Sequence, residues 1–145
     1  MGDSNAPQEF SSAFELRVLS WKARLSNHEH RYYDLLIKCS LTGKLHCSAL
    51  PTFADDIHMK HIVDDALNAK LTVEVSNSFL DDSLRPAGFK QNLSKQENLP
   101  SLRSNDEHRK LTTGQVKLPG KTVADTRHLG GRLSATGSNV PERRQ

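Results

Sequence analysis

Apolar side chains recur along residues 14–39 at alternating steps of four and three positions. The series consists of Phe14, Val18, Trp21, Leu25, His28, Tyr32, Leu35 and Cys39. A heptad spacing of this kind is typical of a helix that packs one face against another helix. Leu16, Leu19 and Leu36 widen the face, which favours a helical bundle over an isolated two-stranded coiled coil. The pattern predicts one long helix whose apolar face is interrupted only at His28.

Ser12 and Glu15 form the sequence signature of a capping box at the start of this helix. In that motif the Glu side chain accepts a hydrogen bond from the Ser backbone amide, so an otherwise unpaired donor is satisfied. Residues 1–10 precede the signature and are interpreted as a flexible leader.

A second helix is predicted after a loop over residues 41–53, which Gly43 and Pro51 punctuate. Its start is placed near Thr52 or Asp55, because such side chains are favourable at a helix N-terminus. Steps of three and four then continue through Met59, Ile62, Ala66, Ala69, Val73, Ser76 and Leu80. The two helices together predict a helical hairpin.

Residues 71–75 also fit a short strand, because they alternate in polarity and include β-branched side chains. The helix is the preferred interpretation, since the longer period runs through this segment. The second helix is predicted to end before Pro86, because proline drives the preceding residue out of helical geometry.

The chain beyond Pro86 differs from the part before it in charge and in composition. Residues 1–85 carry 9 Lys and Arg against 12 Asp and Glu, whereas residues 86–145 carry 11 against 5. The second part also holds six of the eight glycines and four of the six prolines. We therefore predict an all-α protein, with a helical interaction domain at 11–85 and an intrinsically disordered basic tail at 86–145.

The sequence contains no apolar run long enough to span a membrane and no N-terminal signal peptide. These features predict a cytoplasmic or nuclear protein. In either compartment Cys39 and Cys47 are expected to be reduced thiols.

The segment from Gly114 to Thr122 comes near to a phosphate-binding P-loop. That motif needs two glycines separated by four residues, followed by Lys and Ser or Thr. Here five residues separate Gly114 from Gly120, and Pro119 removes a backbone amide donor. The segment is therefore interpreted as a basic linker.

Histidines and cysteines are the other candidates for chemistry, as zinc ligands. They are Cys39, His46, Cys47, His58 and His61, with Asp65 close by. None of them forms the Cys-x2-Cys or His-x3-His pairs that are typical of zinc sites. We predict no metal, no cofactor and no catalytic residue, so the chain is not expected to be an enzyme.

The favoured function is that of an adaptor that assembles with itself or with a protein partner. Its predicted interface lies on the first helix, where large apolar side chains would anchor the contact. The predicted interface residues are Phe14, Val18, Trp21, Leu25, Tyr32 and Leu35.

The alternative is a nucleic-acid-binding protein, with duplex RNA as one candidate ligand, in which a helical dimer presents the basic tail. Lys and Arg contacts to phosphates release counterions and so favour binding. The predicted polyanion-binding residues are Arg109, Lys110, Lys117, Lys121, Arg127 and Arg132.

Overall fold

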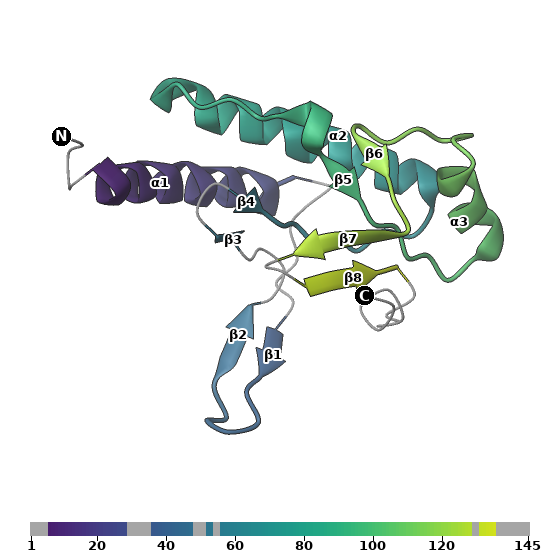
Figure 1. The fold of residues 1–145 in the computed structure, drawn as a ribbon. Helices are drawn as coiled ribbons and strands as arrows, with labels where there is room; N and C mark the ends of the chain where they lie inside the picture. Colours follow the sequence, from purple (N-terminus) through teal and green to yellow (C-terminus); the bar gives the residue numbers. More distant parts are fainter. Residues whose placement is uncertain (1–5, 29–35, 48–51, 54–55, 129–130, 136–145) are drawn as a thin grey trace. The chain divides into compact units, whose positions relative to one another are not determined.

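A computed structural model describes residues 6–28, 36–47, 52–53, 56–128 and 131–135 (Figure 1). The chain divides into two compact units. The first comprises residues 1–62 and 75–91, and the second comprises residues 63–74 and 92–145. A helix, α2 (Ala66–Leu84), contributes its first half to the second unit and its second half to the first.

In the first unit a helix packs on the second half of α2. This helix is α1 (Ala6–Ser26). Two antiparallel strand pairs follow, β1 (Leu36–Lys38) with β2 (Leu45–Cys47) and β3 (Thr52–Phe53) with β4 (Asp56–Ile57). The core joins one face of α1 to α2 and contains Phe14, Val18, Trp21, Leu25, Leu80 and Leu84.

Helix α1 begins at Ala6, inside the segment that was predicted to be a leader. Pro7 is tolerated in the first turn because its missing amide would have no partner there. The Phe10 ring stacks on Phe14, with centroids 5.6 Å apart, and meets the Phe89 ring edge-on at 5.4 Å. These contacts extend the helix six residues beyond the predicted capping box, so Ser12 lies within it.

Helix α1 also ends earlier than predicted, at Ser26. The Ser26 hydroxyl donates to the Lys22 carbonyl at 2.8 Å, and the Asn27 side-chain amide donates to the Ala23 carbonyl at 3.3 Å. Side chains of this kind satisfy the last carbonyls of a helix and so allow it to stop. The prediction of one helix continuing to Cys39 is therefore wrong.

Helix α2 starts at Ala66 rather than near residue 52, where β3 and β4 lie instead. The Asp65 carboxylate caps it by accepting the Asn68 amide hydrogen at 2.7 Å. Residues 71–75 are helical, which confirms the helix rather than the alternative strand. The helix ends at Leu84, as predicted. Pro86 follows in a short 3-10 turn, η1 (Arg85–Ala87), which Gly88 closes with a φ of 76°.

The second unit contains regular structure in the segment that was predicted to be disordered. Its elements are η2 (Leu93–Lys95), β5 (Glu97–Asn98), α3 (Asn105–Thr112), β6 (Lys121–Thr122), β7 (Asp125–His128) and β8 (Gly131–Ser134). Strands β5 and β6 pair in parallel, and β7 and β8 pair antiparallel. Leu111 and Leu118 are buried against Ala66 and Ala69 of α2.

The predicted all-α fold is therefore wrong, and the chain is a mixed α/β protein. The described residues contain helices together with four two-stranded pairings. Strands of two to four residues are too short to impose a visible alternation on the sequence. The second unit is stabilised instead by the packing of Leu111 and Leu118 on α2. The residues in contact are therefore far apart in the sequence. No described helix is long and apolar enough to cross a membrane.

Candidate interaction surfaces

Four of the predicted interface residues are buried inside the chain itself. Phe14, Val18, Trp21 and Leu25 all lie in the core of the first unit. Trp21 is 2% exposed, and its indole N–H donates to the Ser76 carbonyl of α2 at 2.9 Å. This face of α1 is occupied by α2, so its side chains are not displayed to another molecule.

Tyr32 and Leu35, the two remaining residues of the predicted interface, lie outside the described residues. Leu36 and Cys39 belong to the hairpin formed by β1 and β2, not to a helix. The heptad series therefore combines a helical stripe with residues that follow a different geometry.

The β1–β2 hairpin, residues 36–47, carries four large apolar side chains that are more than half exposed. The exposed fractions are 58% for Leu36, 57% for Ile37, 94% for Leu41 and 63% for Leu45. Large apolar side chains that remain exposed together on one short element are candidates for contact with another molecule. Leu36 was predicted to lie on the face of the first helix, and no role was predicted for Ile37, Leu41 or Leu45. The apolar residues on both sides of Thr42-Gly43 are nevertheless a recognisable hairpin signal.

Residues 39–44 connect the two strands. The Cys39 amide donates to the Lys44 carbonyl at 2.8 Å, and the Gly43 amide donates to the Cys39 carbonyl at 2.9 Å. Gly43 has a φ of 69°, a conformation that side chains with a Cβ rarely adopt. Hydrogen bonds from the Thr42 side chain and from the Thr42 and Leu41 amides lower the pKa of the free Cys39 thiol.

The register of the hairpin divides its side chains between two faces. Lys38 pairs with Leu45, and Leu36 lies two positions before Lys38, so these three residues share one face. Ile37 and His46 pair on the other. Each face therefore combines an apolar side chain with a basic or titratable one.

Both outer edges of this hairpin are open within the described part of the chain, because β1 and β2 form a sheet of two strands only. An isolated two-stranded hairpin is marginally stable in water. An open strand edge also presents backbone donors and acceptors to any extended segment that approaches it.

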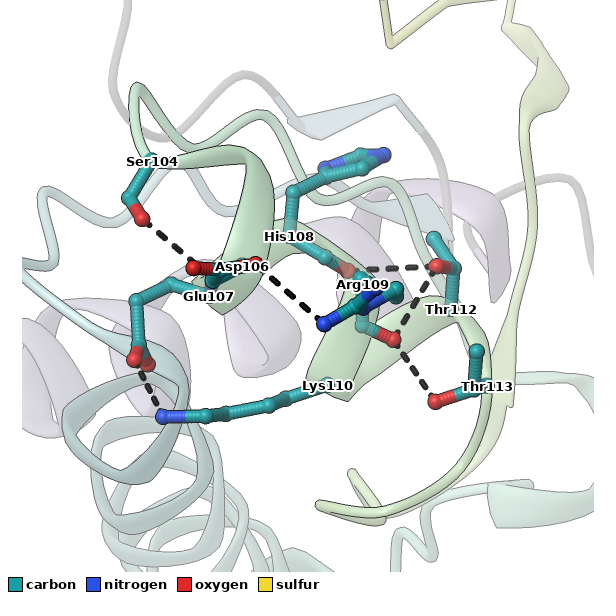
Figure 2. A network of polar contacts seen from close by, with 8 residues as sticks. All are labelled: Ser104, Asp106, Glu107, His108, Arg109, Lys110, Thr112 and Thr113. Atoms are coloured by element: carbon teal, nitrogen blue, oxygen red, sulfur yellow. Dashed lines mark hydrogen bonds and ion pairs between the residues drawn. The ribbon is translucent and has the colours of Figure 1, made fainter.

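Two of the predicted polyanion-binding residues are held in ion pairs on α3. Arg109 lies 3.2 Å from the Asp106 carboxylate, and Lys110 pairs with Glu107; both pairs are drawn in Figure 2. The hydrogen bond that the Lys110 ammonium donates to the Glu107 carboxylate raises the pKa of Lys110. The charge of each cation is therefore balanced by an acidic neighbour one turn away.

Glu107 also has a structural role at the start of α2. Its carboxylate accepts the Ala66 amide hydrogen at 2.9 Å. The Lys110 ammonium, followed by this backbone bond, lowers the pKa of Glu107. Glu107, which belongs to the polar network in Figure 2, thus links α3 to the N-terminus of α2 within the second unit.

The other basic residues are distributed differently. The side chains of Lys117 and Lys121 are exposed. The register of the β7–β8 hairpin sets Arg127 directly across from Arg132. The structure therefore brings these two arginines of the predicted set together at adjacent strand positions, whereas Arg109 and Lys110 are paired elsewhere.

The P-loop-like segment has a packing role at Gly120. Its φ is 81°, and a Cβ on this residue would lie 2.6 Å from the Gln96 carbonyl oxygen. Only glycine permits that approach, which lets the Lys121 amide donate to the same oxygen at 2.9 Å. Among the described residues, no group of three or more His, Cys, Asp or Glu is arranged to hold a metal ion.

Comparison of the chain with models of protein families, with curated proteins and with solved structures finds no match.

Proposed function

We propose that this chain is a non-catalytic interaction protein that binds a protein partner through its β1–β2 hairpin. The observation that carries the proposal is the exposure of Leu36, Ile37, Leu41 and Leu45 on this hairpin. Covering such side chains contributes roughly 25 cal/mol for each Å² of apolar surface removed from water. The hairpin is small compared with a standard interface, so we expect a weak or transient complex.

The proposal relocates the interface from α1 to the hairpin. The face of α1 that was predicted to bind a partner already packs on α2. A partner could reach Trp21 or Leu25 only if the core opened, which would cost most of the stability of the unit. The hairpin needs no such rearrangement, because its apolar side chains are already exposed.

The proposed compartment is the cytoplasm or the nucleus. The described chain has Cys39 as a free thiol, which is compatible with a reducing environment.

Affinity capture with the full chain tests the proposal. Ile37→Ser combined with Leu45→Ser reduces the apolar surface of the hairpin, and we expect it to lose a partner that the native chain retains. Leu16→Ser combined with Leu19→Ser is the matched control, because both residues are exposed on α1. The captured partner should then rebind, in purified form, to the native and control chains only. Equal capture by all three chains would contradict the proposal.

A second candidate function is the binding of a nucleic acid by the second unit. The observation that favours it is the register of Arg127 with Arg132, because like charges set opposite each other destabilise a hairpin and a bound phosphate would offset this. Lys117 and Lys121 add exposed positive charge.

Salt dependence tests this second candidate. Binding to duplex RNA should weaken as salt rises, with a log–log slope near 0.9 in magnitude for each phosphate contacted. Arg127→Gln combined with Arg132→Gln should reduce that slope by about two. A double variant with an unchanged slope would exclude the arginine pair as the binding element.

A further inference from the structure

We infer that the partner segment is an extended, acidic and apolar strand that adds to an open edge of the β1–β2 hairpin. This inference rests on the proposed function and specifies the chemistry of the partner. It follows from three properties of residues 36–47, namely their open strand edges, their exposed apolar side chains and their charge.

The open edges favour a strand over a lipid surface. β1 and β2 pair only with each other among the described residues, so the outer backbone groups of each strand face away from the ladder. An added strand would pair these N–H and C=O groups. Hydrocarbon offers them no partner, and burying an unpaired backbone group is costly.

The charge of the hairpin selects the partner. Residues 36–47 contain Lys38 and Lys44 and neither Asp nor Glu. The Lys38 Cε lies 3.9 Å from the position that a Cβ would take on Gly43. The Lys38 side chain therefore lies beside Gly43, and Lys44 is the next residue in the chain. Both positive charges are therefore found at the turn end of the hairpin.

This charge disfavours a second copy of the same hairpin as the occupant. Pairing two copies would bring four lysines together with no carboxylate from either hairpin. Like charges juxtaposed across an interface oppose association, whereas carboxylates on a partner strand favour it. The apolar requirement comes from Leu36 and Leu45, which share the face that carries Lys38.

Two labelled peptides of equal length provide the probe, one alternating Val with Glu and the other alternating Val with Lys. Fluorescence anisotropy with the full chain at low salt measures their binding. We expect the Val-Glu peptide to bind about tenfold more tightly, because two partly exposed ion pairs distinguish it from the basic peptide. Lys38→Glu combined with Lys44→Glu should reverse this preference.

Lys60→Glu combined with Lys90→Glu is the matched control, because both lysines are exposed and the change in net charge is the same. The control chain should keep the native preference. Equal binding of both peptides, or binding of neither, would overturn the inference. A preference lost equally in the control would assign it to net charge and also overturn it.

Two further outcomes would replace the strand with another occupant. A concentration-dependent dimer in light scattering that Ile37→Ser with Leu45→Ser abolishes would assign the hairpin to a second copy. Sedimentation of the full chain with phosphatidylserine vesicles, lost in the same variant, would assign it to a lipid surface. The proposed function fails separately, if the hairpin variant captures its partner as well as the native chain does.

Discussion

The α1 stripe and the β1–β2 hairpin are both rich in large apolar side chains, and they differ in whether the chain covers them. Leu25 of α1 is fully buried, and Trp21 beside it also bonds to the backbone of α2. On the hairpin, Ile37 and Leu45 remain more than half exposed. The comparison shows that the apolar content of a segment does not by itself decide whether its side chains are covered on folding. The informative property is which apolar residues remain uncovered after folding.

The largest expected effect comes from opening the covered region. Trp21→Ala should destabilise the protein by about 3–5 kcal/mol, because it leaves a cavity in the core and removes the hydrogen bond to Ser76. Urea unfolding followed by circular dichroism measures the change. A loss below about 1 kcal/mol would mean that α1 and α2 are not packed as described.

The pH dependence of stability should distinguish His61 from His46, the histidine of the hairpin. Burial lowers the pKa of His61 to about 4, so the unfolded chain binds more protons than the folded chain between that value and about 6.5. Stability should therefore fall as the pH drops through this window, by about 3 kcal/mol in total.

His61→Gln should flatten the dependence of unfolding free energy on pH between about 4 and 6.5. His46→Gln is the control, because His46 is exposed on the hairpin. If His61→Gln kept the pH profile of the native chain, burial of His61 would be excluded as the cause of the pH dependence of stability.

Arg24 lies at the edge of the covered region and should have an intermediate effect. Its guanidinium is 4.4 Å from the centroid of the Phe79 ring and 3.2 Å from the Asp82 carboxylate. Arg24→Ala should cost about 1 kcal/mol, because both contacts are partly exposed to water. Thermal unfolding at low and high salt measures how much of this cost is electrostatic, since interactions of exposed charges weaken as salt rises.

The smallest effect on stability is expected on the hairpin itself. Leu45→Ala should change the free energy of unfolding by less than about 0.5 kcal/mol, because the side chain is exposed in the free chain. Denaturant unfolding beside Trp21→Ala gives the direct contrast. A cost comparable to that of the tryptophan variant would show that the hairpin is already covered.

The sequence predicted the helical stripe correctly where local pattern and packing agree. Phe14, Val18, Trp21 and Leu25 are buried, and α2 ends before Pro86 because proline acts locally. The helix limits were wrong where tertiary contacts decide. Phe10 is drawn into α1 by Phe89, which is far away in the sequence, and no local pattern reveals that contact.

The second unit was missed for a related reason. Leu111 and Leu118 become core residues only because Ala66 and Ala69 present small side chains to them. Glu107 likewise acquires its role from the Ala66 amide, 41 positions away. A basic composition with many glycines hid these contacts, since the residues that make them are few and widely separated.

Amide hydrogen exchange of the full chain, with and without the Val-Glu peptide, tests the central claim most directly. The account predicts fast exchange across residues 36–47 in the free chain and at least tenfold slowing with peptide, while slow exchange in residues 14–25 of α1 stays unchanged. Hairpin amides that already exchange as slowly as those of α1, or that do not respond to the peptide, would contradict it.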